Sequence, residues 1–343
     1  MLHAAPRDGP VERASALHIA VVVPVFRDWP SFAQLLDRLE RALAGEAVSL
    51  SIVAVNDSPE TEATIRFAPP GSGTIARIEI LHLIRNLGHQ RAIAVGLAYV
   101  EATLECDCVA VMDADGEDRP EDLGRLIRAA RIDPGPIIVA ERRRRSEGML
   151  FRCCYRLYKG AFRLLTGQTV DFGNFCLIPR RFLIHLVSMS EIWSNFPAGI
   201  LQSRLPIKRL PTERGTRYHG RSKMNLIGLI VHGLGAISVF SDAVFVRVTL
   251  LSSTFLVLTG VSILTVLGLK ATGHATPGWA SNLSVSLSVL AVQMVMLSIV
   301  AAFMVLNNRT STTVIPRLNY RNFLLRHEIV WSRPAADAAR AIA

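Results

Sequence analysis

Short apolar runs alternate with helical stripes over the first half of the chain. Residues 18–25, 50–55, 78–84 and 109–112 are rich in β-branched residues and bounded by polar turns, which predicts four strands. Apolar residues at helical spacing predict helices that begin near Gln90, after Pro120 and at Ser31, which is expected to cap its helix. This alternation predicts an α/β domain with a mostly parallel sheet and helices on both faces.

Two long apolar segments lie near the C-terminus. Residues 248–269 carry no charged side chain, and residues 283–306 have only Gln293 as a strongly polar interruption. Each can cross a hydrocarbon core of about 30 Å, so we predict two membrane-spanning helices rather than buried core helices. Before them, a basic amphipathic helix from about Met149 and an apolar segment at 224–240 are typical of a membrane interface.

Lys and Arg are unevenly distributed around the predicted spans. The link at 270–282 carries one Lys, whereas many basic residues precede the first span. Arg309, Arg317, Arg321 and Arg326 follow the second span. By the positive-inside rule, the sheet domain and both termini are expected in the cytoplasm, in a multi-pass protein of the inner (plasma) membrane. The polar N-terminus shows no apolar signal peptide.

The predicted organisation has five parts. They are a disordered N-terminus (1–17), a cytoplasmic sheet domain (18–210), a membrane-interface segment (211–242), a two-helix transmembrane hairpin (243–306) and a cytoplasmic basic tail (307–343). The five cysteines form no C-x-x-C pair and would face a reducing compartment, so free thiols are expected. The spans show no persuasive pair of small residues at four-residue spacing, so a homo-oligomer is possible but the sequence does not decide the oligomeric state.

The formal net charge of +10 indicates an acidic partner. Basic residues concentrate at 141–163 and 204–223, close to the predicted membrane segments. Because the chain has no zinc-finger spacing, aromatic RNA-binding pattern or basic zipper, nucleic acid is not the expected partner. Anionic lipid or phosphate fits better, and the Arg run at 142–145 suits either one.

Four carboxylates crowd the end of the fourth predicted strand: Asp113, Asp115, Glu117 and Asp118. An EF-hand loop is excluded because its Gly and Glu positions hold Asp118 and Gly124. A solvated acidic turn explains Asp113 and Asp115 poorly, since their repulsion is costly unless a cation lies between them. A D-x-D segment suits Mg²⁺ or Mn²⁺, which keeps one or two carboxylates together with substrate phosphates. The implied substrate is a diphosphate whose leaving group needs charge neutralisation.

Five motifs together resemble a known family. They are Pro24-Val-Phe-Arg-Asp28, Val55-Asn-Asp-Ser58, Arg85-Asn-Leu-Gly88, Asp113-Ala-Asp-Gly-Glu-Asp-Arg-Pro120 and Glu213-Arg-Gly-Thr-Arg-Tyr-His-Gly-Arg-Ser-Lys-Met224. In this order, and followed by two spans, they resemble the family-2 inverting glycosyltransferases of GT-A fold. The resemblance is specifically to polyprenyl-phosphate glycosyltransferases, such as dolichyl-phosphate mannose synthase and its bacterial relatives. It covers the chain from about Ile19 to the second span.

The resemblance implies roles for individual residues. Nucleotide binding falls to Pro24, Val25, Asp28, Asp57, Asn86 and Asp113. The Mg²⁺ or Mn²⁺ ligands would be Asp113, Asp115 and Glu117. The acceptor phosphate would be held by Arg214, Arg217, Ser222 and Lys223. The catalytic set would comprise Asp113, Asp115, Arg214, Arg217 and Lys223.

Four positions depart from the family pattern. Arg27 stands in place of Asn, Asn56 in place of the first Asp of the nucleoside turn, and Glu117 in place of a neutral Gln. Asn174 stands where many relatives have an acid. These departures leave the donor open and do not affect the expected reaction class.

The resemblance implies an enzyme that moves a hexose, with inversion, from a nucleotide-diphospho-sugar to undecaprenyl or dolichyl phosphate at the cytoplasmic membrane face. Such a reaction serves cell-envelope glycan synthesis. One alternative is a membrane glycosyltransferase acting on a sugar or lipid hydroxyl, for which Asp118 or Asp171 would be the base. Another is a catalytically silent, membrane-anchored binder of sugar nucleotides. The sugar, the base, the polyprenol length and the pathway stay open.

Overall fold

The computed structural model describes residues 16–58, 73–142, 159–219, 226–274, 278–310 and 314–333. They form two compact units. The first comprises Met1–Arg145, Asp171–Lys223 and Ile315–Ala343, and the second comprises Ser146–Val170 and Met224–Val314. Each unit is described by itself below.

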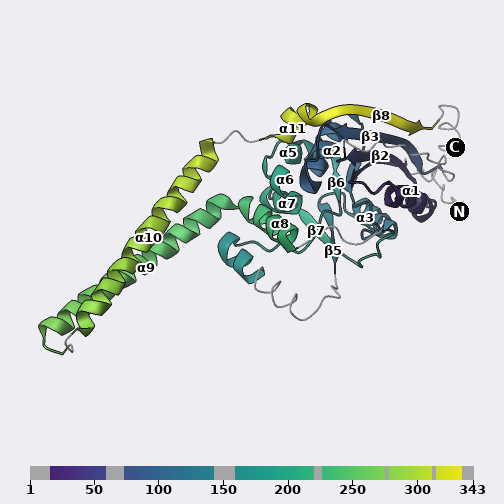
Figure 1. Ribbon diagram of the computed structural model, residues 1–343. Coiled ribbons are helices and arrows are strands. Elements are labelled where there is room, and N and C mark those ends of the chain that lie inside the picture. The colour runs from purple at the N-terminus through teal and green to yellow at the C-terminus, as the bar shows by residue number, and fades with distance from the viewer. Residues whose placement is uncertain are drawn as a thin grey trace, which may run out of the picture. The chain divides into compact units, whose positions relative to one another are not determined.

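An eight-stranded sheet forms the first unit, in the order β7-β5-β6-β4-β1-β2-β3-β8 (Figure 1). The strands are β1 (Leu17–Val25), β2 (Val48–Asn56), β3 (Ile75–Leu83), β4 (Cys108–Val111), β5 (Ile137–Arg142), β6 (Cys176–Pro179), β7 (Ile207–Thr212) and β8 (Leu324–Ser332). Strands β3, β2, β1 and β4 are parallel, as are β5 and β7, whereas β6 and β8 run antiparallel to their neighbours. The predicted mostly parallel sheet is confirmed, with all four predicted strands present.

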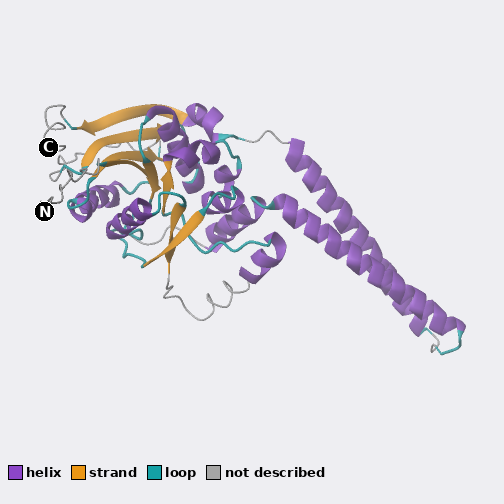
Figure 2. Ribbon diagram, turned by 180° about the vertical axis from the view of Figure 1, so that it is seen from behind, coloured by secondary structure: helices purple, strands orange, loops and turns teal. Residues whose placement is uncertain are grey.

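Helices cover both faces of this sheet (Figure 2). Along β1 and β2, Val22 and Val53 point into one core while Val21 and Ile52 point into the other, as strand alternation requires. One face is covered by α1 (Trp29–Leu43) and α3 (Pro120–Ile132). The other is covered by α2 (His89–Thr103), α5 (Arg180–Val187), α6 (Glu191–Ser194) and α7 (Phe196–Gln202), and α11 (Pro316–Asn319) packs on α2 and α5. Burial on both faces explains why the strands read as continuous apolar runs.

The start of α1 differs from the prediction. The helix begins at Trp29, with Asp28 at the N-cap and no side-chain cap hydrogen bond, so the expected cap at Ser31 was wrong. Pro30 occupies the first turn, where its fixed φ and missing N–H are tolerated. Ser31 is therefore already inside the helix, where its side chain is buried.

The second unit consists of helices. They are α8 (Leu226–Ser238), α9 (Ser241–Ala271), α10 (Trp279–Thr310) and a helical stretch at 159–166. The α9 helix and residues Trp279–Met304 of α10 are long and apolar enough to cross a membrane, and only 17% and 6% of their most apolar windows are buried. Such exposure does not fit the alternative of buried core helices. Most of the predicted basic amphipathic helix lies outside the described residues.

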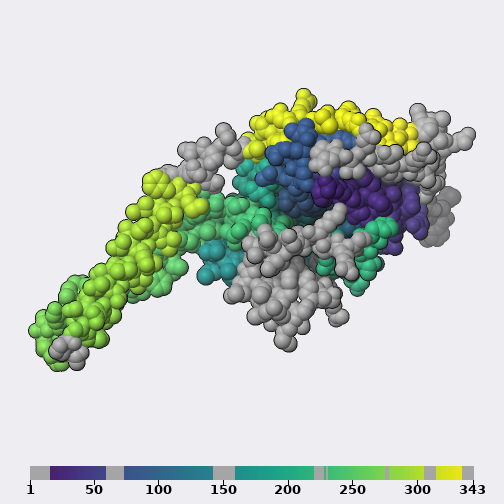
Figure 3. Space-filling view, in the orientation of Figure 1, coloured from purple at the N-terminus to yellow at the C-terminus, as the bar shows by residue number. Residues whose placement is uncertain are grey.

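Strand β8 was not anticipated in the predicted basic tail. It follows α11 and the 3₁₀ turn η1 (Tyr320–Phe323), and it pairs antiparallel with β3 in a register that places Glu328 opposite Ile80. In the space-filling view it forms the yellow edge of the first unit (Figure 3). Residues Leu325 to Glu328 are exposed. Polar side chains are typical of an edge strand, and they weaken the alternation that would have revealed it.

Three cysteines lie among the described residues. Cys106, Cys108 and Cys176 carry free thiols, in agreement with the prediction. Burial raises the pKa of Cys108 to about 12, which makes its thiol unreactive at neutral pH. Cys153 and Cys154 lie outside the described residues.

We predict that Gly96→Ala destabilises the protein, although alanine is normally the better helix former. A Cβ at Gly96 in α2 would lie 2.5 Å from Cγ1 of Val22 and 2.8 Å from Cγ2 of Val55, so the helix would have to move off the sheet. We expect a cost of about 1–3 kcal/mol, measured as a lower melting temperature in detergent.

The control for this measurement is Gly45→Ala. No atom lies within 4 Å of a Cβ at Gly45, so its melting temperature should match that of the unsubstituted protein. Equal melting of the two variants would contradict the close approach of α2 to β1 and β2.

Candidate active site

The turns after β1, β2 and β3 are tied together by Asp57. Its backbone N–H donates to the carbonyl of Val25 at 2.9 Å. Its two carboxylate oxygens accept from the backbone N–H groups of Leu87 at 2.6 Å and Gly88 at 2.9 Å. Burial raises the pKa of Asp57, and these two hydrogen bonds partly oppose that rise. Asp57 therefore fixes the loops at the carboxyl edge of the sheet.

The other residues predicted to bind nucleotide surround this junction. Pro24 and Val25 are buried at the end of β1, Asp28 precedes α1, and Asn86 is exposed after β3. They share the carboxyl edge of the parallel strands, where ligands bind in open α/β sheets. Their contacts with a nucleotide stay a prediction.

Arg27 has a left-handed backbone, with φ of 50°, and its N–H donates to Oγ of Ser58 at 2.9 Å. A residue other than glycine is uncommon in this conformation, and asparagine is enriched there. Holding Arg27 in this region costs on the order of 1–3 kcal/mol, and such strain concentrates at functional loops.

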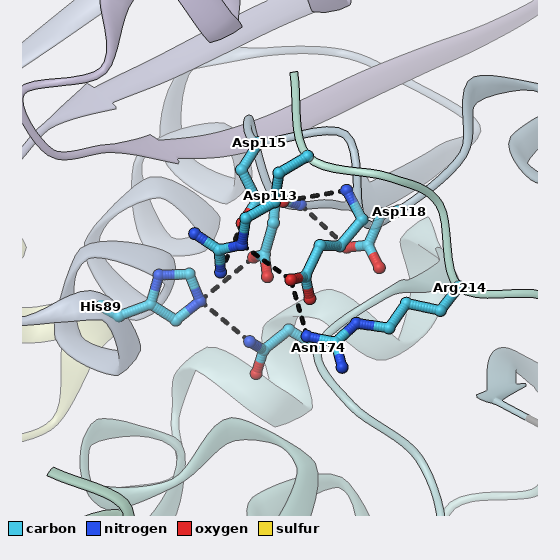
Figure 4. Close-up of polar contacts among 8 residues, drawn as sticks. His89, Asp113, Asp115, Asp118, Asn174 and Arg214 are labelled. Atoms are coloured by element: carbon cyan, nitrogen blue, oxygen red, sulfur yellow. Dashed lines mark hydrogen bonds and ion pairs between the residues drawn. The ribbon is translucent and has the colours of Figure 1, made fainter. Parts of the chain in front are cut away.

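The acidic loop after β4 is folded on its own backbone (Figure 4). The N–H of Asp113 donates to Oδ2 of Asp118 at 2.9 Å, and the N–H of Glu117 donates to Oδ1 of Asp115 at 2.9 Å. Gly116 between them has φ of 89°, a conformation that side chains rarely adopt. Burial raises the pKa of Asp115, and the charge of Asp113 raises it further. A cation between these carboxylates would relieve that repulsion.

Two arginines from the segment after β7 lie on this loop. Nη2 of Arg214 is 2.6 Å from Oε1 of Glu117, and Nε of Arg217 is 2.8 Å from the same oxygen. Nη2 of Arg217 is 2.9 Å from Oδ2 of Asp115. Burial alone would raise the pKa of Glu117, but the hydrogen bonds from Arg214 and Arg217 outweigh it and lower the pKa.

Backbone contacts dock this segment on the acidic loop. The N–H of Gly215 donates to the carbonyl of Glu117 at 2.9 Å, and the N–H of Tyr218 donates to the carbonyl of Asp115 at 2.8 Å. A Cβ at Gly116 would collide with the Tyr218 ring, and one at Gly215 would collide with the Gly116 carbonyl. Glycine at both positions therefore permits the two loops to touch.

His89 is a site residue that the sequence reasoning missed. Its Nε2 lies 3.1 Å from Oδ1 of Asp113 and 2.9 Å from Nδ2 of Asn174 (Figure 4). Asn174 in turn accepts from the Gln90 side chain at 3.1 Å. Burial would lower the pKa of His89, but the charge of Asp113 and its hydrogen bond raise the pKa overall. The sequence feature that could have identified His89 is its position directly after the Arg85 to Gly88 motif, at the start of α2.

Asp113 and Asp115 fit a hard divalent cation that completes its shell with phosphate and water. The guanidinium of Arg217, held by Asp115 and Glu117, shows that this position accommodates positive charge. Among the described residues, no three His, Cys, Asp or Glu side chains form a cluster that could hold a metal ion. Oε1 of Glu117, the third predicted ligand, faces the two arginines. The predicted phosphate ligands Ser222 and Lys223 lie outside the described residues.

Comparison with known proteins gives a family match. Residues 20–184 match the model described as Glycosyl transferase family 2. An undecaprenyl-phosphate 4-deoxy-4-formamido-L-arabinose transferase of Edwardsiella ictaluri is 30% identical over 220 residues, covering 62% of this chain and 64% of that protein. The glycosyltransferase YkcC of Bacillus subtilis is 24% identical over 298 residues, covering 84% of this chain and 88% of that protein. The family match and the observed sheet confirm the predicted GT-A fold class.

Among solved structures, glucosyl-3-phosphoglycerate synthase of Mycobacterium tuberculosis aligns with a TM-score of 0.46 at 15% identity. The alignment covers 66% of this chain and 79% of that chain. This similarity is too low to support an inference about ligands.

We predict that Gly116→Ala releases the segment that carries Arg214 and Arg217. The added methyl group meets the Tyr218 ring, and the left-handed backbone costs about 1–2 kcal/mol more for alanine. Trypsin should therefore cleave after Arg214 and Arg217 roughly 5- to 30-fold faster, with the cut sites identified by mass spectrometry.

Gly173→Ala is the matched control, because a Cβ at this nearby loop glycine meets no atom within 4 Å. Its cleavage rate should equal that of the unsubstituted protein. If Gly116→Ala were cleaved no faster than the control, the docking of the two loops would be disproved.

Proposed function

We propose that this chain, whose residues 20–184 match the model described as Glycosyl transferase family 2, transfers a sugar from a nucleotide-diphospho-sugar to a polyprenyl phosphate. The observation that carries the proposal is the convergence of opposite charges. Arg214 and Arg217 lie directly on the carboxylate loop of Asp115 and Glu117, although about a hundred residues separate them in sequence. One such site can bind both a metal diphosphate and a second phosphate. The E. ictaluri relative, of which this chain spans 64%, bears the name of an undecaprenyl-phosphate transferase.

On the donor side, Asp113 and Asp115 would hold Mg²⁺ or Mn²⁺. When bound, the ion offsets the charge that develops on the departing diphosphate. Asp57 keeps the loops after β1, β2 and β3 in place for the nucleoside. His89, whose Nε2 lies 3.1 Å from Oδ1 of Asp113, would orient that carboxylate.

On the acceptor side, Arg214 and Arg217 would bind and orient the phosphate, and Ser222 and Lys223 are proposed to assist. A phosphomonoester has a second pKa of about 6, so at neutral pH the acceptor is already a largely dianionic nucleophile. No general base is then needed, which agrees with the neutral amide of Asn174 near Asp113. Attack opposite the leaving diphosphate inverts the anomeric centre.

A hydroxyl acceptor would need a base within reach. Asp118, one of the two candidates, is only 2% exposed, and its Oδ2 accepts from the backbone of Asp113. It therefore serves the loop rather than a substrate. This geometry favours the phosphate acceptor, whereas Asp171 stays the candidate if the acceptor is a hydroxyl. A silent sugar-nucleotide binder would have no acceptor phosphate to hold, so it would not need Arg214 and Arg217 beside the carboxylate loop.

The proposed donor sugar is a hexose. The E. ictaluri relative is named for a different sugar, 4-deoxy-4-formamido-L-arabinose. The contacts of the described site residues do not distinguish a hexose from a formamido-arabinose, so the experiment below includes donors of both kinds.

The sheet supports a cytoplasmic hairpin topology. Strand β3 precedes the two candidate spans and β8 follows them, yet the two strands pair from Leu324 to Ser332 of β8. The chain before α9 and the chain after α10 must therefore lie on the same side of any membrane that these helices cross. Combined with the charge asymmetry, this supports our proposal that the catalytic unit lies in the cytoplasm and that the protein is a multi-pass protein of the plasma membrane.

We predict donor-specific labelling of lipid by the detergent-solubilised protein. The panel is UDP-glucose, UDP-N-acetylglucosamine, GDP-mannose and UDP-4-deoxy-4-formamido-L-arabinose, with undecaprenyl phosphate present or omitted. One donor should label organic-extractable lipid only with the phosphate present, and EDTA should abolish labelling. Asp115→Asn should lower the rate on the order of 10²-fold. Equal rates for Asp115→Asn and the unsubstituted protein would favour a silent binder or another metal site.

We predict opposite labelling of two engineered thiols. In intact cells, Thr272→Cys in the link between α9 and α10 should react with a membrane-impermeant maleimide, while Ser332→Cys in β8 should react only after permeabilisation. Both side chains are exposed, so access depends on the side of the membrane alone. Labelling of Ser332→Cys in intact cells would reject this topology.

A further inference from the structure

Glu117 is an acidic residue of the site that the reaction proposed above does not use. Its carboxylate is little exposed, and a single oxygen, Oε1, accepts from Arg214 at 2.6 Å and from Arg217 at 2.8 Å. The family motif has a neutral Gln at this position. The negative charge that Glu117 adds at this position is therefore paired with the guanidinium groups of Arg214 and Arg217.

We propose that Glu117 is a positioning residue for the acceptor phosphate, which holds Arg214 and Arg217 together as one phosphate-binding pair. The inference rests on the proposed function. Two guanidinium groups that converge on one phosphate repel each other before it arrives, and a shared carboxylate offsets that repulsion. A guanidinium has five N–H donors; Arg217 gives one to the shared oxygen and points a second at Asp115, so it keeps donors for a phosphate.

The backbone of this region fixes the arginines independently of the Glu117 side chain. Gly215 and Tyr218 donate to the carbonyls of Glu117 and Asp115, which docks the segment on the acidic loop. The carboxylate of Glu117 then sets the direction of the two side chains and not the path of the chain. Glu117→Gln should accordingly leave the fold intact while loosening the arginine pair.

The competing role for Glu117 is that of a third metal ligand. Mg²⁺ and Mn²⁺ at a diphosphate typically keep one or two carboxylates, which Asp113 and Asp115 already supply. Oε1 of Glu117 is engaged by two charge-assisted hydrogen bonds, which are about twice as strong as neutral ones and would have to break. The two roles differ in which ligand loses affinity when the charge is removed.

The test measures two affinities of the full-length protein in detergent. Farnesyl phosphate, a short polyprenyl phosphate, is titrated calorimetrically, and Mn²⁺ binding in the presence of UDP or GDP is followed by electron paramagnetic resonance. Glu117→Gln should raise the Kd for farnesyl phosphate about tenfold or more, the range expected for loss of hydrogen bonds to a charged group. The Kd for Mn²⁺ should change less than about twofold, a free-energy change of about 0.4 kcal/mol.

Glu121→Gln is the matched control. It removes a carboxylate four residues away, from a half-exposed side chain whose nearest ion pair, with Arg119, is 3.7 Å long. Both affinities and the melting temperature should stay unchanged. In the transfer assay with the labelled donor, Glu117→Gln should raise the KM for undecaprenyl phosphate more than it lowers kcat.

The outcomes separate the hypotheses. A tenfold weaker Mn²⁺ affinity with unchanged farnesyl phosphate binding would make Glu117 a metal ligand, and no change in either affinity would remove any role in binding. Failure of the unsubstituted protein to label lipid would instead reject the proposed transfer, while its binding of farnesyl phosphate would still report on the arginine pair. If the unsubstituted protein does not bind farnesyl phosphate, the pair is not a phosphate site and the inference is overturned.

Discussion

Repulsion among the carboxylates after β4 is the constraint on which the site depends. Two like charges 4 Å apart interact by about 4 kcal/mol at an effective dielectric constant of 20, a large fraction of a typical folding free energy. The chain offsets this cost with groups from distant segments. Arg217 contacts Asp115 and Glu117, and His89 contacts Asp113. Arg217 is also one of the groups that we propose to bind the phosphate substrate.

The same requirement explains the local backbone. An arginine side chain can reach the acidic loop only if the segment after β7 lies close against it, and glycine at 116 and 215 makes that approach possible. The parallel strands provide the platform, since their carboxyl ends gather the polar turns on one edge. Packing of the sheet therefore positions the site, and charge compensation organises it.

The departures from the family pattern acquire physical meanings in this setting. Asn56 is fully buried, its amide lies 3.2 Å from His82, and its oxygen accepts from the Ser58 N–H, so it stabilises the turn after β2. Arg27 takes a left-handed conformation that asparagine adopts more easily. Asn174 links His89 to Gln90 and supplies no base. A phosphate acceptor, which is already ionised, is compatible with this chemistry.

By itself the sequence determined the four parallel strands, the apolar spans and the acidic D-x-D segment, because these depend on local periodicity and on chemistry within a few residues. The predicted cap at Ser31 failed because Pro30 favours an earlier helix start. Only the tertiary structure revealed the pairing of β8 with β3, the contact of His89 with Asp113 and the sharing of Glu117 by two arginines. Each of these joins residues far apart in the chain, and such contacts form only when folding brings their segments together, which local sequence patterns do not encode.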